Sequence, residues 1–243
     1  MKNLIVANWK MNPASQKEGK EIFEAIRDGV KGLKEEVVIC PPSVYLYASV
    51  FGQGIVSMGA QNVYFEDKGA FTGEISCTML KDLGAEYVII GHSERRKYFG
   101  ETDEIINKKI KKALEAGLKV IFCIGETAEE RDAGKKNEVL ERQIKIGLDG
   151  ILNLENLNIA YEPVWAIGTG NNCGVVEAKE AISFIKNLVG AVDRSTGPRV
   201  LYGGSVKSEN SGAYIKEAGA NGLLVGGASL NAEEFVKIVK SAE

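Results

Sequence analysis

The sequence predicts an α/β protein, a single closed (β/α)8 barrel of eight parallel strands that spans residues 1–243 as one domain. Short apolar runs alternate with longer amphipathic, charged segments, which is typical of a parallel sheet covered by helices. The length of 243 residues suits eight such units, because single-domain α/β barrels have roughly 200–250 residues. No linker, low-complexity tract or charge block divides the chain.

The strands are expected at the apolar runs and the helices between them. The runs are, in order, Leu4–Ala7, Val37–Cys40, Val56–Ala60, Tyr87–Gly91, Val120–Ile124, Ile159–Tyr161, Val200–Tyr202 and Leu223–Val225. Helix-like stretches include Gln16–Gly29, Glu104–Ala116, Asn137–Leu148, Ala178–Val189 and Ala232–Lys240. An open, doubly wound sheet is the alternative, but it usually carries Gly-x-Gly-x-x-Gly after its first strand. Here that turn reads Asn8-Trp9-Lys10-Met11-Asn12, which favours the barrel.

The composition argues against several functions. A net charge of −3 is unlike that of a protein that binds nucleic acid or an anionic membrane. The first apolar run ends at Asn8, too early for a signal peptide, and no later run would span a bilayer. The four cysteines, Cys40, Cys77, Cys123 and Cys173, are widely spaced, which suits a reducing cytoplasm rather than disulfides or structural zinc. His92 is the one histidine, so a three-histidine metal site is excluded.

The residues that follow the expected strands carry the candidate chemistry. In a barrel of this kind every strand ends on the same face, and active sites lie there. The residues at those ends are Asn8 and Lys10 after the first strand, His92 after the fourth, Glu162 after the sixth, Gly203-Gly204-Ser205 after the seventh and Gly226-Gly227 after the eighth. Because a carboxylate, an ammonium group, an imidazole and two glycine pairs converge there, we expect one active site. Glycine pairs after the last two strands let backbone N–H groups approach a phosphate.

Glu162 closes the run Ile159–Tyr161 and precedes Pro163, which restricts Glu162 to extended geometry. Ile167 follows, and then Gly168-Thr169-Gly170, where the glycines let the backbone swing or approach a ligand. Proton abstraction in a water-excluded site requires such a fixed carboxylate beside an apolar, glycine-hinged flap. An ordinary strand end and turn is the alternative interpretation of this stretch.

His92 and Lys10 are more often structural or surface groups when each is taken singly, but their place at the strand ends indicates function. Ser93, directly after His92, is expected to cap a helix. A helix N-terminus disfavours imidazolium, so a backbone N–H can donate to one ring nitrogen while the other carries N–H toward substrate. Lys10 would supply positive charge to a phosphate and to a developing enediolate.

The long loop of residues 61–74 follows the third strand, and a loop of this length in a compact barrel is usually functional. Its side chains Val63, Tyr64, Phe65 and Phe71 would be costly in water. The loop either packs on itself or inserts into a second subunit, and the second interpretation is favoured.

With these residues in hand, the chain resembles the triosephosphate isomerase family from end to end. The segments that carry the resemblance are Ala7-Asn8-Trp9-Lys10-Met11-Asn12, Gly91-His92-Ser93-Glu94-Arg95-Arg96, Cys123-Ile124-Gly125-Glu126, Tyr161-Glu162-Pro163-Val164-Trp165-Ala166-Ile167-Gly168-Thr169-Gly170, Leu201-Tyr202-Gly203-Gly204-Ser205-Val206 and Leu224-Val225-Gly226-Gly227-Ala228-Ser229-Leu230. The resemblance implies a TIM barrel that interconverts dihydroxyacetone phosphate and glyceraldehyde 3-phosphate in glycolysis and gluconeogenesis, without metal or cofactor.

The same resemblance assigns roles to residues. It implies Glu162 as the base, neutral His92 as the electrophile that polarises the carbonyl, and Lys10 with Asn8 as stabilisers of the oxyanion. Glu94 resembles the carboxylate partner of the lysine, although it can also be an ordinary acid at a helix start. The phosphate would be held by backbone N–H groups of Gly168, Ser205, Gly226 and Gly227, with Ile167 and Leu224 keeping the base dry. Thr72 resembles the loop residue that reaches the neighbouring subunit's site, which implies a homodimer, with a higher assembly possible.

One stretch departs from the family pattern. After Gly170 the chain reads Asn171-Asn172-Cys173-Gly174-Val175, without the usual lysine, hydroxyl cap and proline, so the open–closed balance of the flap is expected to shift. Two alternatives to the isomerase remain at this stage. One is another phosphate-binding barrel enzyme, such as a sugar-phosphate epimerase or an aldolase with Lys10 as its Schiff-base lysine, and the other is a catalytically silent phosphate-binding relative.

Overall fold

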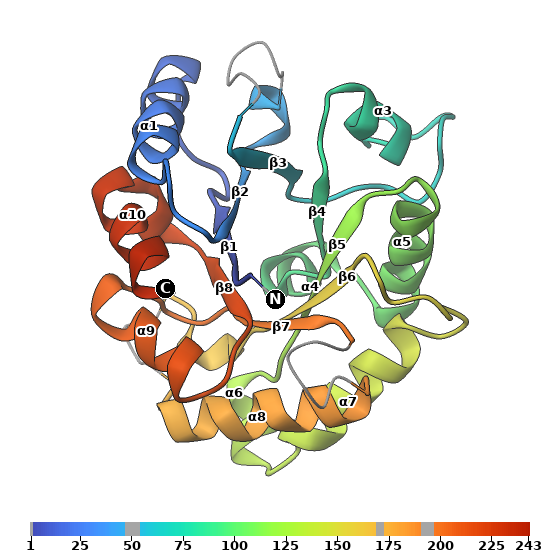
Figure 1. The fold of residues 1–243 in the computed structure, drawn as a ribbon. Coiled ribbons are helices and arrows are strands. Elements are labelled where there is room, and N and C mark those ends of the chain that lie inside the picture. Colours follow the sequence, from blue (N-terminus) through green and yellow to red (C-terminus); the bar gives the residue numbers. More distant parts are fainter. Residues whose placement is uncertain (1, 47–53, 169–172, 191–196) are drawn as a thin grey trace.

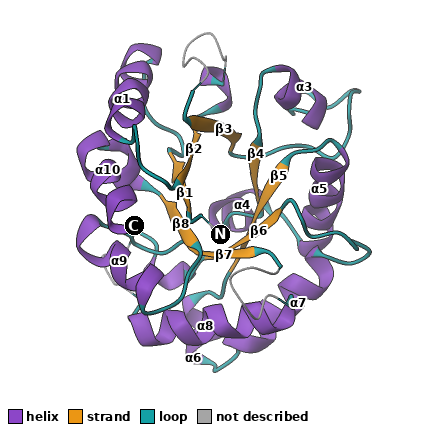
Figure 2. Ribbon diagram, viewed as in Figure 1, coloured by secondary structure: helices purple, strands orange, loops and turns teal. Residues whose placement is uncertain are grey.

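The strands of the chain close into one barrel in the computed structural model, which describes residues 2–46, 54–168, 173–190 and 197–243. Each strand runs parallel to its neighbours in sequence order, and the first pairs with the last. The strands are β1 (Leu4–Asn8), β2 (Glu36–Cys40), β3 (Val56–Ala60), β4 (Tyr87–Ile90), β5 (Lys119–Ile124), β6 (Leu157–Tyr161), β7 (Arg199–Tyr202) and β8 (Gly222–Val225). Figure 2 shows this ring of strands inside a ring of helices. The predicted (β/α)8 barrel of eight parallel strands is confirmed.

Most of the helices lie around the outside of the barrel, whereas α4 is seen across its opening (Figure 1). They are α1 (Gln16–Gly29), α3 (Cys77–Asp82), α4 (Ser93–Phe99), α5 (Asp103–Glu115), α6 (Ala128–Asp132), α7 (Lys136–Gly147), α8 (Val175–Leu188), α9 (Ser208–Lys216) and α10 (Ala232–Ser241). Single turns of 3-10 helix are η1 (Ser43–Tyr45), η2 (Val164–Ala166) and η3 (Gly227–Leu230). The fourth strand was expected to reach Gly91 but ends at Ile90, because Gly91 has a φ of +76° and leaves extended geometry.

The core has two parts that share the strands. Leu4 and Val6 belong to the cluster inside the barrel, whereas Ile5 and Ala7 pack between β1 and the helices. Each of these four side chains is 0% exposed. Strands that are buried on both faces read as near-continuous apolar runs, which is why those runs identified the strands.

The loop of residues 61–74 packs on itself within one chain. The Tyr64 N–H donates to Ile75 O at 2.8 Å, and the Tyr64 ring lies 4.2 and 4.8 Å from the rings of Phe65 and Phe71. Val63 is buried, whereas Phe71 is 41% exposed and Thr72 lies exposed at the tip. The self-packing interpretation therefore describes the loop in one chain, and its insertion into a second subunit stays a prediction. Within the described residues, no helix is long and apolar enough to cross a bilayer.

Candidate active site

The carboxyl ends of β1, β4, β6, β7 and β8 surround one cavity of about 560 Å³. Most of the residues singled out from the sequence line it, namely Asn8, Lys10, His92, Glu162, Ile167, Gly168, Ser205, Leu224, Gly226 and Gly227. Glu94 lines a neighbouring cavity of about 470 Å³ that shares Asn8, Lys10 and His92 with the first. Thr72 lines neither cavity, and its predicted role concerns a second subunit.

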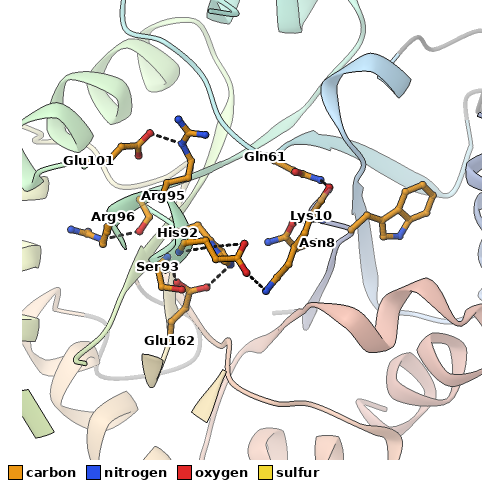
Figure 3. Close-up of polar contacts among 12 residues, drawn as sticks. Asn8, Lys10, Gln61, His92, Ser93, Arg95, Arg96, Glu101 and Glu162 are labelled. Atoms are coloured by element: carbon orange, nitrogen blue, oxygen red, sulfur yellow. Dashed lines mark hydrogen bonds and ion pairs between the residues drawn. The ribbon is translucent and has the colours of Figure 1, made fainter. Parts of the chain in front are cut away.

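Glu162 directly follows β6 and is only 2% exposed. Its N–H donates to Ile124 O at 2.7 Å, which continues the pairing of β6 with β5. Its carboxylate makes two contacts: Oε2 accepts from the Ser93 N–H at 2.8 Å, and Oε1 lies 3.0 Å from His92 Nε2. Figure 3 shows Glu162, His92 and Ser93 meeting at this point. The carboxylate is thus fixed beside the imidazole, at the wall of the cavity.

Two glycines leave the room that Glu162 occupies. A Cβ on Gly125 would lie 1.7 Å from Glu162 O, and a Cβ on Gly203 would lie 3.1 Å from Glu162 Cγ. No side chain can occupy the first position without moving the backbone of Glu162. Gly125 belongs to the Cys123-Ile124-Gly125-Glu126 segment, and its necessity follows from this close approach.

His92, and not Ser93 as expected, is the N-cap residue of α4. The expectation was wrong because the imidazole itself takes the capping position: Nδ1 accepts from the Glu94 N–H at 3.2 Å. With Nδ1 acting as an acceptor, the neutral ring carries its proton on Nε2, which faces Glu162. The sequence had predicted a backbone N–H on one ring nitrogen, and this contact is present.

Lys10 has left-handed backbone geometry, with a φ of +54°. Its N–H donates to Asn8 Oδ1 at 3.1 Å, and its Nζ lies 2.5 Å from Glu94 Oε1. Gln61 fixes the turn, because its Nε2 donates to Lys10 O at 2.8 Å and to Cys40 O at 2.9 Å. Sequence reasoning missed Gln61 as part of the site. Its place directly after β3 was the one available signal.

Arginine side chains hold the backbone that leads into α4, another feature that the sequence did not reveal. Arg96 Nε donates to Gly91 O at 2.8 Å, and its Nη1 pairs with Asp103 Oδ1 at 2.5 Å. Arg95 pairs with Glu101, as Figure 3 shows, at 2.5 Å. Burial alone would raise the pKa of Glu101, but Lys109 and Arg95 hold that pKa below its ordinary value. The two cations therefore stabilise the charged form of Glu101, and the hydrogen bond from Arg96 to Gly91 O fixes the backbone directly before His92.

The other side of the cavity is rich in glycine. Gly168 has a φ of +70°, and a Cβ on Gly168 or on Gly227 would meet no atom of the described residues within 4 Å. Ser205 Oγ donates to Ala166 O at 2.6 Å and so joins the loop after β7 to η2. The first N–H of α9, on Ser208, is already bound to Glu234 Oε1 at 2.7 Å. The backbone of Gly226 and Gly227 at the start of η3 remains exposed to the cavity for an anion.

The predicted flap after Glu162 includes residues that the structure does not describe. Thr169, Gly170, Asn171 and Asn172 lie outside the described residues, so the predicted flap and its altered hinge stay predictions. The first turn of α8 has Gly174 as its N-cap residue, with no side-chain cap hydrogen bond, as its sequence had suggested. Within the described ranges, no group of three or more His, Cys, Asp or Glu residues is arranged to hold a metal ion.

Comparison with known proteins matches nearly the whole chain. The family model described as triosephosphate isomerase matches residues 3–242. The triosephosphate isomerase of Aquifex aeolicus (strain VF5) is 49% identical over 251 residues, covering 99% of this chain and 100% of that protein. That of Alkaliphilus oremlandii (strain OhILAs) is 46% identical over 246 residues, covering 98% of each. The crystal structure of triosephosphate isomerase from Bartonella henselae superposes with a TM-score of 0.89 at 39% identity, covering 99% of each chain.

Proposed function

Because the chain belongs to the triosephosphate isomerase family, we propose that it interconverts dihydroxyacetone phosphate and D-glyceraldehyde 3-phosphate through an enediolate. The chain is an isomerase, and the roles of its residues are the proposal. The observation that carries these roles is the 3.0 Å approach of Glu162 Oε1 to His92 Nε2 at the wall of a cavity that also contains Lys10. One small molecule can touch all three groups there.

Glu162 is the base. Its carboxylate takes the proton from the carbon beside the carbonyl, and the C–H electron pair forms the carbon–carbon double bond of the enediolate. The protonated Glu162 then returns the proton to the neighbouring carbon, so no net proton is gained or lost. A well-placed general base contributes roughly 10²–10⁴-fold to the rate. The near-complete burial of Glu162 supports this role, because it keeps water from the carboxylate.

His92 and Lys10 stabilise the charge that develops on oxygen. His92 presents Nε2–H as a neutral donor to the carbonyl oxygen and moves protons between the two oxygens. The Lys10 ammonium and the Asn8 amide stabilise the enediolate, and Glu94 orients that ammonium through the 2.5 Å contact. In studied oxyanion holes, removing one such donor costs roughly 3–4 kcal/mol.

The phosphate is held on the opposite side of the cavity. We assign it to backbone N–H groups of Gly168, Ser205, Gly226 and Gly227, since these residues line the cavity. Ile167 and Leu224 are the apolar groups that keep the base dry, and both line the same cavity. A phosphate needs such donors because the chain as a whole is slightly acidic, with a net charge of −3.

We further propose that the whole chain, residues 1–243, works as one catalytic domain in a cytoplasmic homodimer. Met11 is 94% exposed and Phe99 is 68% exposed, and both line the second cavity beside Lys10. We assign this groove to the exposed loop residue Thr72 of a second copy, and the exposure of Met11 and Phe99 supports the assignment. Sedimentation velocity tests the dimer: wild type should sediment at twice the chain mass, and Thr72→Arg should shift it toward monomer. A monomeric wild type would exclude the homodimer.

The deciding experiment is a coupled assay of the purified protein in both directions, with Glu162→Asp beside wild type. Withdrawal of the carboxylate by one methylene, about 1 Å, should lower kcat by roughly 100-fold with little change in KM. Glu141→Asp, at an exposed site in α7, is the matched control and should keep the wild-type rate. Wild-type-like turnover by Glu162→Asp would remove Glu162 from the role of base.

The same preparation distinguishes the other barrel enzymes. An aldolase that uses Lys10 would be trapped by borohydride with substrate and would gain mass, whereas the proposed isomerase would not. Absence of turnover by the wild-type protein would instead indicate a silent phosphate-binding relative.

A further inference from the structure

Arg131, in α6, contacts both ends of the stretch that runs from the base to α8. Its guanidinium carbon lies 3.8 Å from the centroid of the Trp165 ring. Its Nε and Nη2 donate to the two carboxylate oxygens of Glu177, at 3.1 and 3.3 Å. Trp165 belongs to η2, directly after Pro163, and Glu177 lies in the first turn of α8. A single side chain thus joins three elements.

We propose that Arg131 is a positioning residue for the isomerase reaction: it braces η2 against the first turn of α8 and so keeps Ile167 and Gly168 in the cavity wall. The inference rests on the proposed function, because Ile167 and Gly168 are assigned to the substrate there. Arg131 itself does not line the cavity, so it acts through Trp165 and Glu177.

The start of α8 needs such support. Its N-cap residue is Gly174, which makes no side-chain cap hydrogen bond, and its first residue is Val175 rather than proline. A helix start without a capping side chain is weakly fixed. Glu177 occupies the third helical position, from which a glutamate often reaches back to the N-cap backbone. Here both of its oxygens pair with Arg131, and the planar guanidinium matches a carboxylate in this bidentate manner.

The Trp165 end is fixed from two sides. The indole Nε1 donates to Glu126 Oε1 at 2.8 Å, and the ring face receives the guanidinium. The next residue, Ala166, is 0% exposed, and its carbonyl oxygen accepts a hydrogen bond from the Ser205 hydroxyl. A shift of Trp165 would therefore move the backbone that leads to Ile167 and the tie to the loop after β7.

The helix that carries Arg131, α6, is itself well fixed. It begins with a complete capping box, in which the Thr127 side chain accepts from the Glu130 N–H and the Glu130 side chain accepts from the Thr127 N–H. It also follows β5 directly through Glu126, the residue whose carboxylate receives the indole N–H. Because α6 is joined to the barrel in this way, the guanidinium connects both Trp165 and Glu177 to β5.

A neighbouring ion pair provides the matched control. Lys136 Nζ lies 3.7 Å from Glu180 Oε2, which joins α7 to α8 one helical turn beyond Glu177. Loss of this pair removes one cation–carboxylate contact on α8, as loss of Arg131 does, but leaves Trp165 and the first turn of α8 as they are. Lys136→Gln should therefore change neither kcat nor KM measurably.

The test compares Arg131→Gln, Arg131→Lys, Glu177→Gln and the double variant Arg131→Gln/Glu177→Gln with wild type and Lys136→Gln. We expect kcat/KM to fall about 3- to 10-fold in Arg131→Gln, the size that one ion pair and one cation–π contact provide together. The kcat/KM of Arg131→Lys should lie between those of wild type and Arg131→Gln. An ammonium group can pair with Glu177, but it is not planar and cannot stack on the Trp165 ring as a guanidinium does. The double variant should be no slower than Arg131→Gln, since the two residues act as one unit.

Tryptophan emission gives a readout that does not depend on activity. The chain has two tryptophans, and the Arg131→Gln minus wild-type difference spectrum should report a changed environment of Trp165, absent from Lys136→Gln. Unchanged kcat/KM in Arg131→Gln, with only a lower Tm, would show an ordinary surface ion pair and overturn the proposal. A wild type without isomerase turnover would instead reject the proposed function, and the emission difference would still be measurable.

Discussion

The two sides of the active-site cavity are built differently. On the side of β4, β5 and β6, the reactive groups are side chains, and each is held by a backbone contact, such as the Ser93 N–H on Glu162 and the Glu94 N–H on His92. On the side of β7, β8 and η3, the wall is rich in glycine, and a Cβ on Gly227 would meet no atom of the described residues within 4 Å. One side is fully occupied by the protein itself, and the other is open for a ligand.

This difference implies a division of labour that kinetics can separate. Groups that act only on developing charge should affect kcat, whereas groups that hold the phosphate equally in ground state and transition state should affect KM. Variants on the first side should therefore lower kcat, and variants on the second side should raise KM. A variant that changes both parameters strongly would contradict the division.

The largest effect is expected from His92→Asn. Asparagine is a good N-cap residue, so its side chain can still accept from the Glu94 N–H and preserve α4. It cannot, however, present a donor at the place of Nε2. We expect kcat to fall by roughly 10²–10³-fold, the effect of one lost oxyanion donor, with KM nearly constant. Steady-state kinetics in both directions checks this, and inhibition by inorganic phosphate should be unchanged.

The next effect concerns Gly125. In Gly125→Ala the new Cβ would lie 1.7 Å from Glu162 O, so the backbone of the base must move. A misplacement of about 1 Å should lower kcat by roughly 100-fold, and Tm should fall as well. Gly212→Ala is the control: its Cβ would be 3.5 Å from Ser241 O, an ordinary contact, and alanine favours the helix by roughly 0.5–1 kcal/mol. If Gly125→Ala keeps wild-type kcat, the close approach does not position the base.

A smaller effect, on KM rather than on kcat, is expected from Gly227→Ala. The methyl group has room among the described residues, and because Gly227 lines the cavity it would take up space beside the proposed phosphate site. We expect KM and the inhibition constant for inorganic phosphate to rise together by about 10-fold, equal to about 1.4 kcal/mol of binding, while kcat stays nearly constant. An increase in KM without a matching loss of phosphate inhibition would place the phosphate elsewhere.

The sequence predicted most of the site because its reactive groups are rare residue types at strand ends. A lone histidine after β4 and a Glu-Pro pair after β6 stand out in any α/β pattern. Gln61 and Arg96 do not, since amides and arginines are common. What matters is that Gln61 spans the ends of β1 and β2 and that Arg96 reaches Gly91 O, distances that exist only in the folded chain.

Hydrogen bonds made by the backbone are the other part of the site that the sequence could not predict. The Ser93 N–H holds Glu162, but any non-proline residue has an N–H, so the residue type gave no indication of the bond. The N-cap assignment failed for a related reason. Serine is a common cap, and the sequence cannot show that the imidazole of His92 occupies that place one residue earlier. The fold itself was easier to predict, because burial on both faces of each strand leaves a repeated apolar signal.

The smallest effect is expected from alkylation of the cysteines, which tests whether solvent reaches the side of the cavity formed by β4, β5 and β6. Cys123 is the second-to-last residue of β5 and is fully buried. Its pKa is raised well above the ordinary value of a thiol, mainly by desolvation and then by the charge of Glu162. Burial also raises the pKa of Cys77 to about 11 and that of Cys173 to about 12. A raised pKa keeps the thiol protonated, so at pH 8 roughly one Cys77 in a thousand is a thiolate, and fewer of Cys173.

Iodoacetamide at pH 8 should therefore leave native turnover unchanged over a period in which all four cysteines of the urea-unfolded chain are alkylated. Mass spectrometry of the native protein identifies any thiol that does react. Alkylation of Cys123 with loss of kcat would mean that the side carrying Glu162 opens to solvent, and the contrast between a closed catalytic side and an open phosphate side would no longer hold. Alkylation confined to Cys173 would leave that contrast intact, because this residue precedes α8, where its carbonyl accepts from the Tyr214 hydroxyl, and it does not line the cavity.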